Sequence, residues 1–212
     1  AFKADIGDGG LSFAASLYHV QSVTHGPTDD IYIGDAIGKI RKIDITNNII
    51  STIGGSGIQG YSGDGEISTK AKIGCPSSIV VDNNNNVYFT DSAFHVIRKI
   101  DKDGIIHTLV GTGIPGFSVD RTLANKARIA EPRGLAVSKN GQLFFSDSGN
   151  NKIRTVLSDG TLATLVGNDH VKDNKGNQLN LNNPCGMCIF EETTLLFCNN
   201  YNNQIGAVKI SI

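Results

Sequence analysis

The 212-residue sequence has no tryptophan, one methionine and four cysteines, and its charges nearly cancel at a net −1. Balanced charge provides no electrostatic basis for binding nucleic acid or an anionic membrane, which a basic surplus would favour. No apolar stretch approaches the roughly 18–20 residues that span a bilayer. The first residues lack the apolar centre of a signal peptide, which by itself does not determine the compartment. Four cysteines are too few and too clustered for a disulfide scaffold. The redox compartment stays open, with an extracellular location as the working expectation.

The sequence does contain abundant glycine, 25 residues, and an internal repeat. Residues 87–100 comprise an apolar run that ends in Asp91, a short polar loop, and a second apolar run that carries Arg98. The same pattern recurs at 31–43 and at 143–154, with a degenerate fourth copy at 195–206. One constant interval separates Asp35, Asp91 and Asp147. Such a fixed period indicates a repeat architecture.

Each repeat unit is predicted to form four short strands. In the third unit we expect strands at 134–138, 143–146, 152–157 and 161–166, joined by Asn-Gly and Asp-Gly turns that favour hairpins. Residues 143–145 are apolar in succession, as expected when both faces of a sheet are covered. A lone unit cannot cover both of its faces, so the units must stack around an axis. The prediction is an all-β fold, a β-propeller of four-stranded antiparallel blades, with blades at about 7–57, 61–113, 117–167 and 168–212 and no outer strand in the last.

The motifs in these units resemble NHL repeats, most closely the longer variety that begins with Gly-Asp-Gly. That leader, followed by Val-Val-Asp, Val-Tyr-Phe-Thr-Asp-Ser and Ile-Arg-Lys-Ile in the second unit, carries the resemblance. The family implies a propeller that usually has six blades and often closes by sharing a strand between its termini. We therefore expect a segment of a larger propeller, or an assembly subunit, rather than a ring of four blades. The unpaired edge at Val208, Ile210 and Ile212 is a candidate assembly site.

An aspartate and an arginine recur at fixed places in the first three units. The aspartate ends the second strand and the arginine lies in the third, where a carboxylate can accept two guanidinium hydrogen bonds. The fourth unit replaces both together, with Asn199 and Gly206. This joint loss favours a coupled structural role over three catalytic sites. The predicted pairs within blades are Asp35 with Arg41, Asp91 with Arg98, and Asp147 with Arg154.

Neither the Gly-Asp-Gly leaders nor the histidines predict a metal site. The leaders lack the alternating carboxylates and closing glutamate of a calcium loop, so we interpret them as turns in which a capping aspartate lies between glycines at positive φ. The five histidines share no repeat position. The NHL resemblance extends to metal-dependent amidating lyases that use axial histidines, and only His19 and His25 could approach the axis. We predict no metal and no cofactor.

Cys185 and Cys188 have the spacing of a metal knuckle or a redox pair, but the second Cys-x-x-Cys of a zinc site is missing. The hairpin register expected for the third unit, when copied, places Cys188 opposite Phe197 and Met187 opposite Cys198. On that register Cys185 is the diagonal neighbour of Cys198, and Cys188 points to the other face. A Cys185–Cys198 disulfide is one alternative, and buried free thiols are the favoured interpretation.

The loops between the second and third strands should cluster on one face and form the best interaction candidate. Exposed aromatic residues in such loops often anchor partners. The alternative is that these residues pack against neighbouring loops. The candidate residues are Lys39, Phe94, His95, Asn150, Lys152 and Tyr201.

The predicted function is a non-catalytic protein-interaction, scaffold or assembly module. Its partner would be another protein, further copies of the chain, or the rest of a longer polypeptide. One alternative, implied by the resemblance, is a propeller enzyme with an axial metal site similar to lyases or lactonases. Another is a single-stranded RNA-binding NHL domain, which the net charge of −1 does not favour.

Overall fold

The computed structural model describes residues 7–167 and 180–210. They form four antiparallel sheets, and within each sheet the strands neighbour one another in chain order. The first sheet contains β1 (Val20–His25), β2 (Ile31–Asp35), β3 (Lys39–Asp44) and β4 (Ile49–Gly54). The second contains β5 (Pro76–Val81), β6 (Val87–Asp91), β7 (Val96–Ile100) and β8 (Ile106–Val110). The third contains β9 (Pro132–Val137), β10 (Leu143–Asp147), β11 (Lys152–Val156) and β12 (Leu162–Val166). The fourth has three strands in the described part, β13 (Pro184–Phe190), β14 (Thr194–Asn199) and β15 (Gln204–Lys209).

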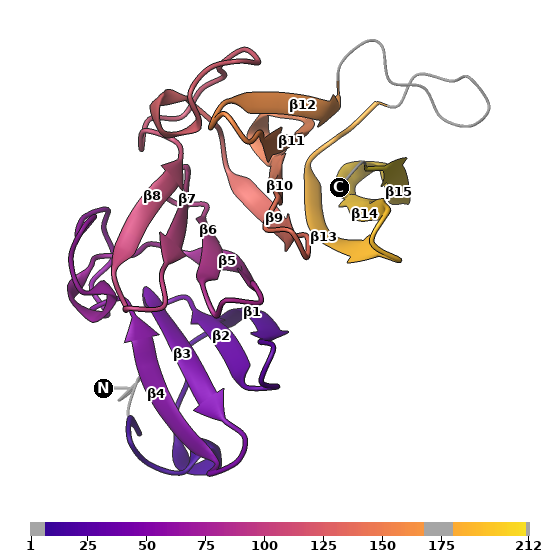
Figure 1. Cartoon of the computed structure of the whole chain (residues 1–212). Coiled ribbons are helices and arrows are strands. Elements are labelled where there is room, and N and C mark those ends of the chain that lie inside the picture. Colours follow the sequence, from indigo (N-terminus) through magenta and orange to yellow (C-terminus); the bar gives the residue numbers. More distant parts are fainter. Residues whose placement is uncertain (1–6, 168–179, 211–212) are drawn as a thin grey trace.

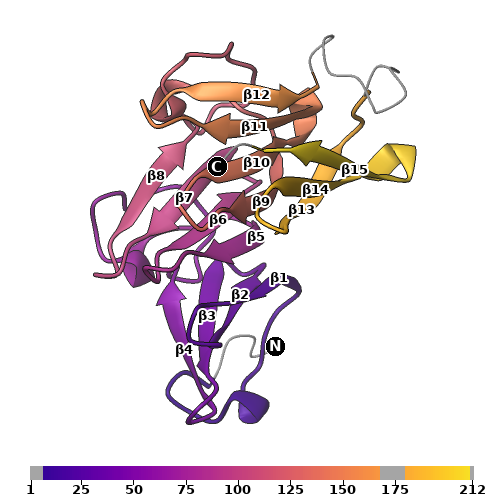
Figure 2. The same cartoon turned by 45° about the vertical axis from the view of Figure 1, so that its right-hand side comes forward.

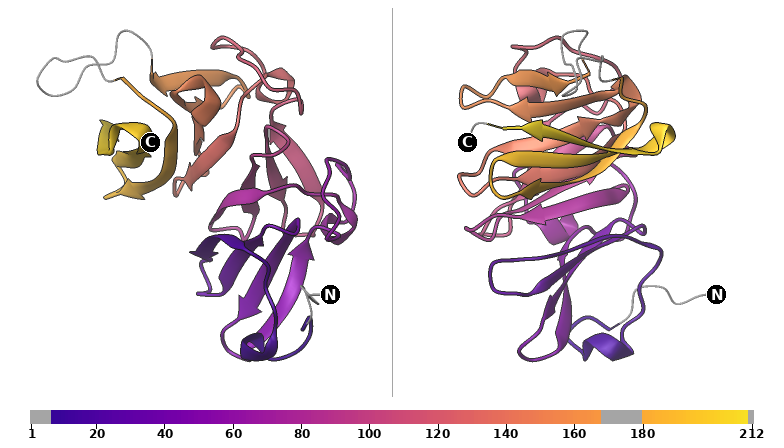
Figure 3. Two further views of the ribbon diagram at one scale, coloured as in Figure 1. Left: turned by 180° about the vertical axis from the view of Figure 1, so that it is seen from behind. Right: turned by 90° about the vertical axis from the view of Figure 1, so that its right-hand side faces the viewer.

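The four sheets are the blades of a β-propeller, stacked side by side along an arc (Figures 1 and 3). The first strand of each blade lies on the concave side, so that β1 packs beside β5, β5 beside β9, and β9 beside β13. The helical content of the described residues is limited to short 3-10 turns: η1 (Ser12–Ala14), η2 (Ser68–Lys70), η3 (Ala124–Lys126), η4 (Ser148–Asn150) and η5 (Asn200–Asn202). No helix in the described residues is long and apolar enough to cross a membrane.

The prediction of an all-β propeller is confirmed, and the strands of the third blade lie close to their expected positions. The first strand begins earlier than expected, at Pro132, because Pro132 still pairs with Asp147 across a bulge. A bulge adds one residue to one strand of a pair and bends that strand. The same bulge occurs in the first hairpin of every blade. It allows the first strand of each blade to stay paired up to the end of the second strand.

The apolar core lies between blades rather than within them. Tyr32 and Ile40 of the first blade form one buried cluster with Ile79 and Phe89 of the second. Equivalent clusters join the second blade to the third and the third to the fourth. Each interior blade therefore covers both of its faces with neighbours, as the successive apolar residues of β6 and β10 require.

The concave side also carries a repeated hydrogen bond between neighbouring blades. The Ser22 hydroxyl of the first blade donates to the Pro76 carbonyl at 2.9 Å, and the Ser77 hydroxyl donates to the Pro132 carbonyl at 3.3 Å. These two bonds fix the first strand of one blade to the start of the next. At the third junction the hydroxyl of Ser148, which follows the second strand, donates to the Pro184 carbonyl instead.

The segments 57–75 and 113–131, which we call the leader segments, join successive blades on the outside. In the first of them the amide of Gly55 donates to the Ser68 carbonyl at 2.9 Å, so that η2 packs on β4 of the preceding blade. Its residue Ile67 bridges to Ile105 of the following blade. The 3-10 turn η2 ends at Lys70, and Ala71 and Ile73, which follow it, are fully buried.

Candidate functional site

A hydrogen bond at the end of the second strand recurs in all four blades. The side-chain oxygen of the last residue of that strand accepts a backbone N–H from the segment that enters the blade. The asparagine of the fourth blade keeps this bond because its amide oxygen is also an acceptor. The donor and acceptor pairs are Tyr18 with Asp35 (2.9 Å), Gly74 with Asp91 (2.7 Å), Ala130 with Asp147 (2.7 Å), and Asn182 with Asn199 (2.7 Å).

The arginine of the third strand is fully buried in each of the first three blades. In blades two and three an aromatic ring of the leader segment covers the guanidinium. The centroid of the Tyr61 ring lies 5.3 Å from Cζ of Arg98, and the centroid of the Phe117 ring lies 5.4 Å from Cζ of Arg154. A cation over a ring face is stabilised by the ring's quadrupole, more so where water is excluded. Each arginine also forms an ion pair with the aspartate of the Gly-Asp-Gly motif that precedes its blade. The ion pairs are Arg41 with Asp8 (2.8 Å), Arg98 with Asp64 (2.6 Å) and Arg154 with Asp120 (3.3 Å).

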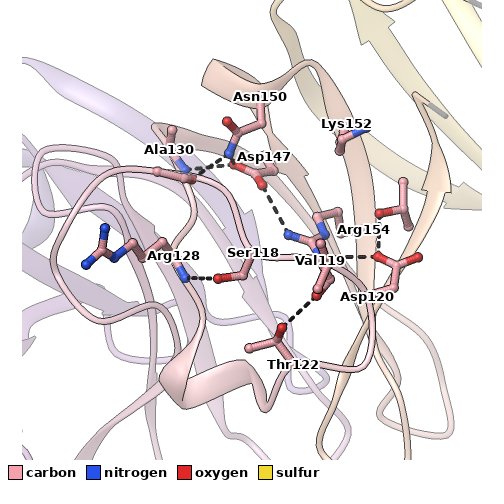
Figure 4. A network of polar contacts seen from close by, with 12 residues as sticks. Ser118, Val119, Asp120, Thr122, Arg128, Ala130, Asp147, Asn150, Lys152 and Arg154 are labelled. Atoms are coloured by element: carbon pink, nitrogen blue, oxygen red, sulfur yellow. Dashed lines mark hydrogen bonds and ion pairs between the residues drawn. The ribbon is translucent and has the colours of Figure 1, made fainter.

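Figure 4 shows the arrangement in the third blade, where Arg154 lies between Asp147, at 3.5 Å, and Asp120, at 3.3 Å. Burial raises the pKa of Asp147, although its hydrogen bonds from Ala130 and Asn150 and the Arg154 charge act in the opposite direction. Burial also acts to raise the pKa of Asp120, but the hydrogen bond from the Thr164 hydroxyl and the Arg154 guanidinium outweigh it, and the pKa of Asp120 is lowered. The arginine thus bridges a buried carboxylate and a partly exposed one.

The prediction from the sequence paired each arginine only with the aspartate at the end of the second strand. It did not include the aspartate of the Gly-Asp-Gly motif. The glycines of the leader do adopt positive φ, +93° at Gly63 and +80° at Gly65. The Asp64 carboxylate, however, accepts a hydrogen bond from Arg98 instead of only capping the turn. The constant interval between Asp8, Asp64 and Asp120 was the signal that could have revealed this contact.

The fourth blade explains why the arginine and the aspartate are lost together. A Cβ at Gly206 would lie 2.2 Å from the Phe197 ring, so Phe197 occupies the space of the missing side chain. Asn199 needs no cation because it is neutral, and its Nδ2 donates to the Asn180 carbonyl at 3.0 Å. The buried charge and its counter-charge are both absent from this blade.

The side chains of five of the six predicted interaction residues contact the rest of their own chain. The Phe94 ring stacks on Tyr61 with centroids 6.4 Å apart, and Asn150 donates to the Gly116 carbonyl at 2.8 Å. Lys152 donates to the Gly167 carbonyl at 2.8 Å, and Lys39 lies half-buried beside Gly57. The sixth, Tyr201, is 67% exposed. A partner-binding role for these residues stays a prediction.

The fifth of these residues, His95, links two blades. Its Nδ1 accepts the backbone N–H of Glu131 at 3.1 Å, so the ring proton lies on Nε2 when this bond is made. In the next blade Asn151 takes the same place, and its Oδ1 accepts the N–H of Asn183 at 2.8 Å. His95 and Asn151 both have left-handed backbones, with φ of 55° and 54°. Asparagine adopts this conformation more readily than most residues.

The third blade therefore predicts the effect of substituting His95. His95→Asn is expected to change the free energy of unfolding by no more than about 0.5 kcal/mol, because asparagine keeps the acceptor and tolerates φ above zero. His95→Ala is expected to lower it by about 1–2 kcal/mol, since alanine lacks the acceptor and is strained at this φ. Urea denaturation of the two variants measures the difference. Equal effects would show that the inter-blade bond contributes nothing.

The cysteines differ from the prediction in both register and burial. β13 pairs Cys188 with Leu196 and Met187 with Phe197, and a bulge at Gly186 then places Cys185 directly opposite Cys198. The expected pairings of Cys188 with Phe197 and of Met187 with Cys198 were therefore wrong. Cys185, Cys188 and Cys198 share one face of the sheet. All four cysteines are free thiols, and none is fully buried.

The blades at the two ends of the arc each have one sheet face that no other blade of the described residues covers (Figure 2). In the first blade Val23 is 66% exposed on β1, although Ile33, with which it pairs, is buried. The equivalent pair of the second blade, Ile79 and Phe89, is buried against the first blade. In the fourth blade Phe190 on β13 and Ile205 on β15 are exposed. Each end face is thus one half of an interface between blades.

At the predicted assembly edge, Val208 and Ile210 pack towards the third blade, while Ile212 lies outside the described residues. In the described part of the chain β15 pairs with β14 alone. The backbone edge of β15 is therefore open there, although the side chains beside it are covered.

The histidines considered for an axial metal do not converge. His19 packs edge-on against Tyr18, and the ring of His25 lies 3.2 Å from the Gly26 carbonyl oxygen. Within residues 7–167 and 180–210, no group of three or more His, Cys, Asp or Glu side chains could hold a metal ion.

The blade topology and the repeated aspartate and arginine define an NHL-type β-propeller. The family model of the Teneurin NHL domain matches residues 57–115 and 116–208. This match spans more than half of the chain, and the chain belongs to that family.

NHL repeat-containing protein 2 of Bos taurus is 28% identical over 213 residues, covering 84% of this chain and 29% of its own length. A Bacteroides thetaiotaomicron protein of unknown function superposes with a TM-score of 0.68 at 18% identity, covering 88% of this chain and 46% of that one. A Xanthomonas campestris gluconolactonase superposes with a TM-score of 0.61 at 14% identity, covering 92% and 60%. Structural likeness at such identities shows the fold alone. The chain spans less than a third of the length of the first curated relatives that it matches.

Proposed function

We propose that the chain is a non-catalytic assembly module, which binds a protein partner, further copies of itself or the rest of a longer polypeptide through the exposed faces of its end blades. The observation that carries this proposal is that each end face is half of an interface that the chain builds three times internally. Val23 and Ile205 are exposed on these faces, whereas the corresponding surfaces of the interior blades are covered. Apolar surface gains about 25 cal/mol per Å² when it is removed from water.

The partner that fits such a face is another β-blade. The face of the first blade would accept a sheet that presents residues equivalent to Tyr32 and Ile40, which cover Ile79 and Phe89 in the interior. The exposed face of the fourth blade would accept a blade that presents the surface which each interior blade turns towards the blade before it. Association of the two different faces would be head to tail, which gives rings or filaments rather than an isologous dimer.

The alternative of an axial-site enzyme gains no support from the repeated carboxylates. Asp91 and Asp147 accept backbone N–H groups and, in the third blade, face Arg154, so they are already satisfied within the fold. Enzymes of that kind require several such groups to converge on a bound substrate or metal. The assembly module therefore remains the function that the geometry favours.

A matched pair of substitutions tests the proposal. Val23 on the end face and Val119 in a leader segment are both 66% exposed, so lysine at either position should not disturb the core. Val23→Lys is expected to raise the dissociation constant of self-association about tenfold or more, which corresponds to about 1.4 kcal/mol, because a charge would enter an apolar interface. Val119→Lys should associate as the unmodified chain does. Sedimentation equilibrium measures both, and equal association of the two variants would contradict the proposal.

A further inference from the structure

Two cysteines face each other across the first hairpin of the fourth blade. Cys185 on β13 lies directly opposite Cys198 on β14. Directly opposed residues of antiparallel strands have Cα atoms about 4.5–5.5 Å apart, which is within the roughly 4.4–6.8 Å that a disulfide bridges. The two strands are already held together, so forming the bond requires only rotation of two side chains.

The other cysteines are poorly placed to compete. Cys188 pairs with Leu196 and is therefore a diagonal neighbour of Cys198. Diagonal neighbours lie about 7–8 Å apart, beyond the range of an unstrained disulfide. Cys75 is in the second blade, at the entry to β5. The geometry thus selects one pair out of the four thiols.

The selected pair is accessible to a reagent. Cys198 is exposed, and Cys185 is half-buried beside it. Burial raises the pKa of Cys185, and the adjacent Cys198 thiol raises it further. The thiolate is the attacking species in exchange reactions. Because Cys198 is exposed and Cys185 is half-buried, a small disulfide reaches Cys198 first, and Cys185 is placed beside it to close the bond.

We propose that Cys185 and Cys198 are a thiol–disulfide exchange site, in which a small-molecule disulfide oxidises the two thiols to a cross-strand disulfide. The Cys198 thiolate attacks one sulfur of the small disulfide, forming a mixed disulfide and releasing one thiolate. The Cys185 thiolate then attacks Sγ of Cys198, forming the protein disulfide and releasing the second thiolate. The two protons lost by the cysteines are taken up by the released thiolates. The protein thiols are oxidised by two electrons, and the small disulfide is reduced to two thiols. This inference does not rest on the proposed function, but Cys198 lies beside Ile205 on the end face of the fourth blade, so the thiols are open to the reagent only while that face is not covered by a partner.

The test uses the complete chain incubated with oxidised glutathione. Free thiols are blocked with one alkylating reagent, disulfides are then reduced, and the new thiols are labelled with a second reagent before peptide mass spectrometry. The expected result is that Cys185 and Cys198 carry the second label in equal amounts and, in a digest made without reduction, form one disulfide-linked peptide pair, whereas the exposed Cys188 can carry the second label only through a glutathione adduct. Raising the pH is expected to speed closure, because more of the Cys185 thiol becomes thiolate.

Three serine substitutions complete the design. Cys188→Ser is the matched control from the same strand and should form the disulfide at the same rate. Cys185→Ser should stop at a glutathione adduct on Cys198, and Cys198→Ser should form no disulfide in the fourth blade. A disulfide that includes Cys188, or first-label modification of all four cysteines in the unmodified chain, would overturn the proposal. The unmodified chain decides the question even if a variant fails to fold.

Discussion

Replacing Arg154 by methionine is expected to lower the free energy of unfolding by about 3–5 kcal/mol, the cost of leaving one member of a buried ion pair without its partner. Both Arg154 and Asp147 have fully buried side chains in the described structure. Methionine replaces the aliphatic part of the arginine but not its charge, so the Asp147 carboxylate would remain buried without a cation. Asp120 is 41% exposed and can be solvated instead. Urea denaturation, with the slope checked for constancy, measures the loss.

The fourth blade supplies the rescue for this variant. Asp147→Asn combined with Arg154→Met reproduces the neutral state of Asn199 and Gly206, and asparagine keeps an oxygen to accept the Ala130 amide. The double variant is expected to be more stable than Arg154→Met alone by about 2 kcal/mol, because the uncompensated charge is removed. Arg121→Ala is the control, since Arg121 is 74% exposed and its pairing with Asp159 is expected to contribute less than about 1 kcal/mol. A double variant less stable than Arg154→Met would contradict the interpretation of Arg154 as a counter-charge.

Replacing Gly111 by alanine is expected to cost about 3 kcal/mol or more. Gly111 follows β8 with φ of +98°, and a Cβ there would lie 2.4 Å from the His95 carbonyl oxygen and 3.0 Å from the Val96 Cα. Both are backbone atoms, which cannot move aside as a side-chain tip can. The variant would have to separate the end of β8 from the loop that precedes β7. Overpacking of this kind adds to the strain of a left-handed alanine.

Gly104 in the same blade separates these two contributions. Its φ of +77° imposes the same backbone strain, but nothing lies within 4 Å of the added Cβ. Gly104→Ala is therefore expected to cost only about 1–2 kcal/mol. The difference between the two variants in thermal or urea unfolding measures the close approach alone. If Gly104→Ala proved as destabilising as Gly111→Ala, the close contact at His95 would have no energetic weight.

The fold could be predicted from the sequence because each of its determinants is local and repeated. The Asp-Gly and Asn-Gly turns delimit strands, and residues such as Phe89 and Phe145 recur at one interval. Any repeat with two apolar faces must stack. Ala71 and Ile73 recur one interval later as Ala127 and Ile129, and all four are buried.

The contacts of individual side chains could not be predicted in this way. The leader aspartates Asp64 and Asp120 recur at the same interval as the blades, which marks them as structural, but their ion pairs with the arginines form because the leader segment folds over the outer strand. The pairing of Cys185 with Cys198 depends on the bulge at Gly186. A bulge changes the register by one residue and thereby changes which side chains share a face. It recurs in the first hairpin of all four blades, but it becomes visible only once the strand pairing is known.

The central claim, that the end faces are halves of an interface, is tested most directly by the native mass of the chain from light scattering over a range of concentrations. The account predicts a mass above the 22.5 kDa of one chain, rising with concentration and reduced by Val23→Lys. A mass that stays at 22.5 kDa at every concentration would mean that the faces bearing Val23 and Ile205 remain uncovered in solution, and would contradict the claim.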